Sequence, residues 1–211
     1  MKNNDDIKNT PSDKDALEQI FLTREEFFIE EQKIRLREHF HRYASIRRFC
    51  YGKVLDFASG CGYGSFILAS NPEITEITAV DKNKKAYDWA IKEYSHEKIL
   101  YKNIEAENIS GHFDTMVSLE TIEHLNDPKI LNIIAERCSV KQIILSFPNK
   151  KSTHFNSWHF HDLVVQDVLN IFTKYVVYHH FQRGDVSFLL LIRLPENAPF
   201  HIYRNITDLQ L

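Results

Sequence analysis

The sequence is short of cysteine, of long apolar runs and of surplus charge, and each shortage argues against a class of protein. Its three cysteines are widely spaced with no C-x-x-C pair, which argues against a disulfide framework or a zinc knuckle and favours a reducing cytoplasm. The longest apolar run, Val186 to Ile192, is far too short to span a bilayer, so no membrane insertion is expected. The net charge of −3 provides no general attraction for nucleic acid.

The 211 residues suffice for one domain with a full core. Residues 1–13 are rich in Asn, Asp and Lys and are expected to be a flexible tail with no secretory signal, which leaves residues 14–211 as a single domain. Between Thr23 and Phe49 apolar residues recur at steps of three and four, which predicts a helix beside the sheet. We expect residues 14 to about 49 to form a helical lid.

The chain is organised around a short strand, a glycine turn and the start of a helix, in the stretch Val54 to Ser65. Gly60, Gly62 and Gly64 remove three Cβ atoms in five residues, so the backbone can turn tightly and approach a ligand. The following helix points free N–H groups into the turn, which suits a carboxylate or a phosphate. The spacing is not the G-x-G-x-x-G of dinucleotide-binding proteins, which disfavours an NAD-dependent oxidoreductase.

Strands and helices alternate along the rest of the chain, which indicates an α/β fold with a mostly parallel sheet covered by helices on both faces. The expected strands are 54–57, 74–80, 99–101, 113–119 and 140–147, followed by an antiparallel hairpin of 175–181 and 187–194. The expected helices are 63–70, 84–94, 128–137 and 162–172.

The stretch from Asp56 through Gly60, Gly62 and Gly64 resembles the glycine-rich motif of class I S-adenosylmethionine-dependent methyltransferases, with Ala58 where many members have glycine. The resemblance implies a Rossmann-like, seven-stranded sheet with an antiparallel last strand. It also implies that Asp81, after the second strand, accepts hydrogen bonds from the ribose of S-adenosylmethionine. The cofactor-binding residues implied by the resemblance are Asp56, Ala58, Gly60, Gly62, Tyr63, Asp81, Lys82, Glu105, Ala106, Ser118, Leu119 and Glu120.

Two later stretches carry further parts of the resemblance. Glu105 and Ala106 stand in a segment similar to the D-A-x-x-L motif that meets adenine, with Asn103 as a rival for that contact. The stretch Phe113 to Leu125 resembles the F-D-x-V-x-S strand that ends beside the methionine part of the cofactor. In its continuation, Glu120 would share a helical face with Glu123 and His124 if the segment is helical.

The segment from Ser146 to His161 resembles bacterial methyltransferases that modify sugars and surface polysaccharides, through its S-x-P-N and N-x-x-H elements. This resemblance implies an enzyme that methylates a sugar hydroxyl of a carbohydrate or polysaccharide precursor. A hydroxyl is a weak nucleophile at neutral pH, so a histidine base helps. We expect His159 or His124, with Glu123, to be catalytic. The acceptor wall is expected to comprise the N-terminal helix, Tyr43 and the loop 149–162.

The same residue types leave two alternatives open. Glu120, Glu123, His124 and His159 (or His161) are also similar to the ligands with which small-RNA 2′-O-methyltransferases hold Mg²⁺ or Mn²⁺. The third hypothesis is a non-catalytic partner protein with a cofactor-binding fold. The intact glycine turn and Asp81 disfavour it.

Overall fold

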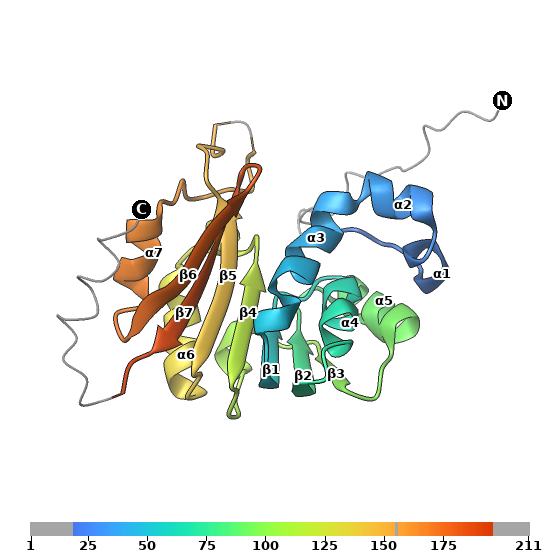
Figure 1. The fold of residues 1–211 in the computed structure, drawn as a ribbon, viewed down its shortest axis with the longest axis horizontal. Coiled ribbons are helices and arrows are strands. Elements are labelled where there is room, and N and C mark those ends of the chain that lie inside the picture. The colour runs from blue at the N-terminus through green and yellow to red at the C-terminus, as the bar shows by residue number, and fades with distance from the viewer. Residues whose placement is uncertain (1–18, 155, 196–211) are drawn as a thin grey trace.

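The computed structural model describes residues 19–154 and 156–195, and Figure 1 shows its ribbon. The described part contains a seven-stranded sheet in the order β3-β2-β1-β4-β5-β7-β6. Strands β1 to β5 pair in parallel, whereas β7 is antiparallel to both β5 and β6. The predicted α/β sheet with an antiparallel last strand is therefore confirmed. Its strands are β1 (Gly52–Phe57), β2 (Ile74–Val80), β3 (Ile99–Lys102), β4 (Thr115–Leu119), β5 (Gln142–Pro148), β6 (Tyr175–Arg183) and β7 (Val186–Arg193).

Two apolar cores cover the two faces of this sheet, because alternate residues of a strand point to opposite sides. Val54 of β1 belongs to the core formed with α3 and α4, and Leu55 belongs to the core formed with α6 and α7. In Figure 1 the N-terminal helices lie together near α4 and α5, far from α7. The helices are α1 (Arg24–Phe27), α2 (Glu30–Arg35), α3 (Arg37–Ile46), α4 (Tyr63–Ala69), α5 (Lys84–Tyr94), α6 (Lys129–Arg137) and α7 (Val165–Ile171), with short 3-10 turns η1 (Arg47–Phe49), η2 (Ala106–Asn108) and η3 (Ile122–His124).

The N-terminal region corrects the prediction of one helix from Thr23 to Phe49, since it is broken into α1, α2, α3 and η1. The breaks fall at Ile29, which is extended, and at Leu36, whose ψ of 18° is not helical. Aromatic packing accounts for the folding back. In one continuous helix Phe27 and Phe40 would lie roughly 20 Å apart along the axis. Their ring centroids are instead 5.0 Å apart.

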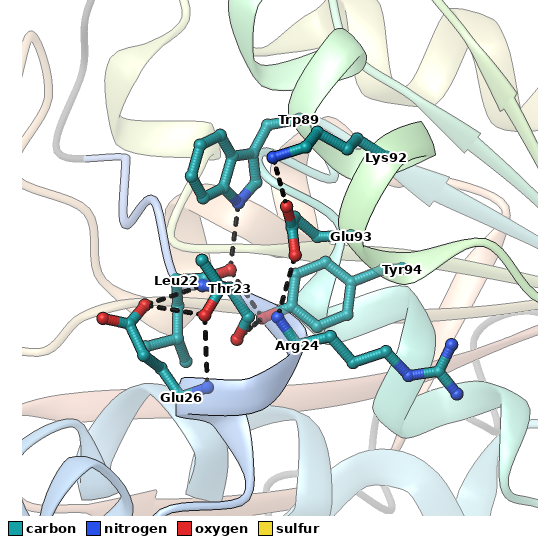
Figure 2. A network of polar contacts seen from close by, with 8 residues as sticks. All are labelled: Leu22, Thr23, Arg24, Glu26, Trp89, Lys92, Glu93 and Tyr94. Carbon is teal, nitrogen blue, oxygen red and sulfur yellow. Dashed lines mark hydrogen bonds and ion pairs between the residues drawn. The ribbon is translucent and has the colours of Figure 1, made fainter.

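The start of this region is fastened to α5, as Figure 2 shows. The indole N–H of Trp89 and the hydroxyl of Tyr94 both donate to the carbonyl of Leu22, each at 2.9 Å. Thr23 and Glu26 form a reciprocal capping box at the start of α1. Hydrogen bonds at Leu22 therefore hold the start of the N-terminal region against α5.

The remaining boundaries differ from prediction by one or two residues, with one exception. The helix expected from Asp162 begins only at Val165, because Val164 is extended and the Asp162 carboxylate accepts hydrogen bonds from Ser152 and Thr153 instead. The expected tail, residues 1–13, lies outside the described residues. Among the described helices, none has the length and apolar character needed to cross a bilayer. All three cysteines are buried free thiols.

Candidate active site

A cavity of about 900 Å³ opens at the carboxyl ends of the parallel strands. This is the edge at which open α/β sheets bind their ligands. Its wall includes the turn after β1, the ends of β2 and β4, the segment after β3, helix α3 and the loop 156–160. The sequence-predicted site residues that line it are Ala58, Gly60, Tyr63, Asp81, Lys82, Glu105, Ala106, Leu119, Glu120, Glu123, His124 and His159.

The glycine turn presents backbone to this cavity at Gly60. Its φ is +57°, and a Cβ added there would meet no atom within 4 Å, so the space beside it is open. Ala58 also adopts a positive φ, 57°, where a non-glycine residue is strained. Backbone strain of this kind is commonly retained where a loop must hold a functional shape.

The next two glycines serve packing, which corrects the expectation that all three lie flat against a ligand. A Cβ on Gly62 would lie 2.7 Å from the Ala90 side chain of α5 and 2.9 Å from the Tyr101 hydroxyl. A Cβ on Gly64 would lie 2.2 Å from the ring of Tyr43. The absence of a Cβ at Gly64 therefore lets α3 pack closely against α4, and neither glycine is part of the cavity wall.

Asp56 and Ser118 also differ from expectation, since both are fully buried and neither lines the cavity. Asp56 accepts a hydrogen bond from Ser65 at 2.5 Å and one from the Tyr43 hydroxyl at 3.4 Å. Burial raises the pKa of Asp56 to about 7, although these two hydrogen bonds oppose the rise. Asp56 thus connects α4 and α3 and is not part of the cavity wall.

Asp81 lies at the cavity edge and is 9% exposed. One of its carboxylate oxygens accepts from the Gly60 N–H at 2.8 Å, and the other accepts from the Asn83 N–H at 2.8 Å. Burial raises the pKa of Asp81, and the two backbone N–H groups partly offset that rise. The amide of Asn103 donates to the carbonyls of Asp81 and Lys82, so it supports this turn. The strand end and the glycine turn are therefore joined through one carboxylate.

Glu120 follows β4 in a left-handed conformation with φ of 48°, and η3 begins only at Ile122. The condition under which Glu120 would share a helical face with Glu123 and His124 is therefore not met. Its carboxylate accepts from the Ser146 hydroxyl at 2.7 Å and lies 3.3 Å from the guanidinium of Arg42. The ion pair joins helix α3 to the end of β4. Sequence analysis missed Arg42, because a charged helical residue usually faces solvent.

Two imidazoles meet at the cavity wall beside a buried carboxylate. The rings of His124 and His159 are perpendicular, with centroids 4.6 Å apart. Nδ1 of His124 lies 2.8 Å from the carbonyl of Trp158, so it carries a proton, because a carbonyl can only accept. Nε2 of His124 is 3.9 Å from the carboxylate of Glu123, which is 1% exposed.

Hydrogen bonds to the carbonyls of Glu123 and Leu125 hold the loop that carries His159 against η3. The N–H of Phe160 donates to the carbonyl of Glu123 at 2.8 Å, and Nε2 of His161 lies 2.9 Å from the carbonyl of Leu125. The predicted convergence of the exits of β4 and β5 is thus present in the structure. His161 engages backbone and is not part of the cavity wall.

The geometry separates the proposed metal ligands. Among the described residues, Glu123, His124 and His159 offer ligand atoms that lie within 4.8 Å of one another. Glu120 is not in this group, because its carboxylate engages Arg42 and Ser146. The four-ligand set inferred from the sequence is therefore reduced to three residues here.

The sequence matches a known protein family. A family model described as a methyltransferase domain matches residues 28–174, more than half of the chain. No protein of curated function matches the sequence.

Solved structures match the fold at low sequence identity. N-methyltransferase NodS from Bradyrhizobium japonicum WM9, in complex with S-adenosyl-L-homocysteine, matches with a TM-score of 0.62 and 15% identity over 75% of this chain and 87% of that chain. Magnesium protoporphyrin IX methyltransferase (ChlM) from Synechocystis PCC 6803 with bound S-adenosylhomocysteine gives 0.64 and 15% over 79% and 88%. The same protein with bound S-adenosylmethionine gives 0.62 and 17% over 77% and 83%.

Proposed function

Since this chain belongs to the methyltransferase-domain family and is an S-adenosylmethionine-dependent methyltransferase, we propose that its methyl acceptor is a hydroxyl group of a sugar or sugar-containing precursor. The observation that carries the proposal is the pair of imidazoles, His124 and His159, at the wall of the cavity beside the Glu123 carboxylate. A hydroxyl acceptor needs a group that takes its proton at neutral pH, and histidine titrates in that range. The buried free thiols fit a reducing compartment, and we place the enzyme in the cytoplasm.

The residues present fit the cofactor. The open space beside Gly60, which a Cβ would fill, suits the close approach of a ligand to backbone. Asp81 would hold the ribose hydroxyls and Glu105 the adenine edge, while the segment Leu119–Glu120 would border the methionine part. When bound, S-adenosylmethionine supplies a methyl carbon already activated by the positive charge on sulfur.

The acceptor side combines aromatic and polar groups, as a saccharide site requires. Trp158 and Phe160 line the cavity together with Arg42, His39 and Asn156. Aromatic faces cover the apolar faces of sugar rings, and the polar side chains can hydrogen-bond hydroxyls. This mixture supports a sugar acceptor over a wholly apolar one.

In the proposed step, Nε2 of His159 would take the proton of the acceptor hydroxyl while the hydroxyl oxygen is methylated. The carbon–sulfur bond of the donor would break with its electron pair left on sulfur, so S-adenosylhomocysteine is the leaving group. The lid and the loop 156–160 hold the hydroxyl in line and exclude water. Glu123, 3.9 Å from His124, would stabilise positive charge on the imidazole pair when that proton arrives. The protein therefore contributes alignment and a proton acceptor, and the proton leaves through His159.

The proton-transfer role is tested by replacing the two histidines separately. We expect His159→Gln to lower kcat about 10²- to 10⁴-fold, the usual contribution of a general base, with the affinity for S-adenosylhomocysteine unchanged. His124→Gln should give a smaller loss. His179→Gln, on β6 and outside the cavity wall, is the matched control and should keep wild-type turnover. Wild-type turnover in both cavity variants would refute the assignment.

The acceptor class is tested by transfer of tritium from methyl-labelled S-adenosylmethionine to nucleotide sugars, a polysaccharide extract and short RNAs. The proposal expects label in the carbohydrate fractions, lost in His159→Gln. Label only in RNA would contradict it.

A metal-assisted transfer is the second candidate, because the ligand atoms of Glu123, His124 and His159 lie within 4.8 Å of one another. The three residues are of the types that hold a divalent ion, which can lower the pKa of a bound hydroxyl. EDTA would abolish activity and Mn²⁺ or Mg²⁺ would restore it. Full turnover in EDTA would reject this candidate and retain the imidazole base.

A further inference from the structure

A buried hydrogen bond holds the inner nitrogen of His159. The hydroxyl oxygen of Ser152 lies 2.6 Å from Nδ1 of His159, and Ser152 is only 4% exposed. The same ring faces the cavity, and it packs edge-to-face on His124. With Nδ1 engaged by Ser152, Nε2 is the ring nitrogen to which the proposed function assigns the acceptor's proton.

Ser152 is itself fixed by the loop that carries it. Its N–H donates to a carboxylate oxygen of Asp162 at 2.6 Å, and its carbonyl accepts from the N–H of Asn156 at 2.9 Å. Asp162 also accepts from the N–H and the hydroxyl of Thr153. These bonds lower the pKa of Asp162 to about 2, so the carboxylate stays ionised throughout the neutral range. Hydrogen bonds within the loop therefore hold the backbone of Ser152 in place, with its hydroxyl beside His159.

The two histidines are held differently. The Trp158 carbonyl forces a proton onto Nδ1 of His124, whereas a serine hydroxyl can either donate or accept. If Nδ1–H of His159 donates to Ser152, then Nε2 carries a lone pair and can act as a base. The same hydrogen bond persists when Nε2 gains a proton, since Nδ1–H is unchanged in the imidazolium. No rearrangement of the loop is needed during the transfer.

We propose that Ser152 is a positioning residue that holds His159 with its proton on Nδ1 and its Nε2 lone pair facing the acceptor. The proposal rests on the proposed function, in which His159 takes the acceptor's proton. Ser152 itself touches neither substrate nor cofactor in this account and acts only through the imidazole.

The tautomer can be measured without an acceptor. Protein labelled with ¹⁵N-histidine and loaded with S-adenosylhomocysteine would be examined by long-range ¹H–¹⁵N correlation, and His159→Gln would identify the resonances of His159. We expect a protonated Nδ1 and an unprotonated Nε2 in the wild type, and loss of this preference in Ser152→Ala. The wild type carrying its proton on Nε2, or a Ser152→Ala spectrum equal to that of the wild type, would overturn the proposal.

Thr153→Val provides the matched control. It removes a neighbouring hydroxyl that bonds the same Asp162 carboxylate at 2.7 Å, but in the described structure that hydroxyl bonds Asp162 and not His159. Its His159 spectrum should equal that of the wild type. Thermal melting and S-adenosylhomocysteine affinity, measured on every variant, verify that the loop change leaves the fold intact.

Turnover separates this proposal from the one on which it rests. We expect Ser152→Ala to lower kcat about tenfold with KM unchanged, and Ser152→Thr, which keeps the hydroxyl, to recover most of the loss. A changed tautomer with unchanged kcat would uphold the role of Ser152 and remove His159 from the chemistry. An unchanged tautomer together with an inactive His159→Gln would do the reverse.

Discussion

The proposed cofactor side and the proposed acceptor side of the cavity differ in how they are built. The cofactor side consists of backbone at the ends of β1 and β2, held by one carboxylate, Asp81, that joins the two strand ends. The proposed acceptor side consists of side chains from α3, η3 and the loop 156–160, and the Arg42–Glu120 ion pair joins α3 to the end of β4. A backbone cradle recognises one invariant ligand, whereas a wall of side chains on loops can change its substrate without disturbing the sheet.

Removal of Asp81 should have the largest effect on the proposed cofactor side. Asp81→Ala takes away the acceptor for the Gly60 N–H and the proposed ribose ligand, so we expect S-adenosylhomocysteine to bind roughly 10- to 150-fold more weakly, or about 1.5–3 kcal/mol. Asp88→Ala, which removes an exposed acid of α5 paired with Lys84, is the control and should bind normally. Calorimetry measures both. Equal affinities in the two variants would remove Asp81 from the cofactor site.

Gly60 and Gly64 belong to one turn but have separate roles, since Gly60 borders open space and Gly64 packs against Tyr43. Gly64→Ala forces a Cβ to within 2.2 Å of the Tyr43 ring, so we expect a loss of stability of about 1–3 kcal/mol from overpacking. Gly60→Ala meets no protein atom but retains a positive φ, so it should lose about 1 kcal/mol or somewhat more. Its main effect should be weaker cofactor binding. Thermal melting with and without S-adenosylhomocysteine reports both quantities, and the reverse ranking would contradict the assignment.

The buried carboxylate of Asp56 leads to a prediction of how the free energy of unfolding depends on pH. The pKa of Asp56 rises from 3.8 to about 7 on folding, so between these values the folded state binds a proton that the unfolded chain releases. The free energy of unfolding should therefore fall as the pH rises from about 4 to about 7. Asp56→Asn, which does not titrate, should show a shallower fall, by at least about 1 kcal/mol over this window.

Urea unfolding at pH 5, 6, 7 and 8 would measure this difference. Asp81, whose pKa is also raised, contributes a fall of the same sign in both proteins, so the variant should keep part of the fall. Parallel pH profiles for the wild type and Asp56→Asn would show that Asp56 ionises normally in the fold.

The smallest expected effect concerns the hydrogen bonds that hold Leu22 against α5. Trp89→Phe removes the donor to the Leu22 carbonyl at 2.9 Å but leaves the Tyr94 donor in place, so we expect a local loss of about 0.5–1.5 kcal/mol. Hydrogen exchange of peptides covering residues 19–28 should accelerate accordingly. Lys92→Gln removes an exposed ion pair with Glu93 in the same network and should change little. Equal exchange in both variants would show that the indole is not an anchor.

The cofactor side could be predicted from the sequence because its parts are local. A strand, its glycine turn and the acid after the next strand are each read from a few consecutive residues, and parallel strand ends meet at one edge. Gly60 and Asp81 accordingly lie where the sequence placed them. Asp56 and Gly64 could not be assigned correctly, because their partner Tyr43 comes from a helix whose position depends on tertiary packing.

The acceptor side could be predicted by residue type but not by arrangement. The histidines were identified from their positions after β4 and β5. The breaks in the N-terminal helical region were not predicted, because they depend on the contact between Phe27 and Phe40, and no local propensity marks where the helix breaks. Arg42 and Ser152 have ordinary sequence surroundings, and only the distances to Glu120 and His159 reveal their roles.

Calorimetric titration of the wild-type chain with S-adenosylhomocysteine tests the central claim most directly, since it needs neither an acceptor nor a variant. The account predicts saturable binding at one site per chain. A folded sample, verified by its melting transition, that releases no heat with S-adenosylhomocysteine or S-adenosylmethionine would contradict it.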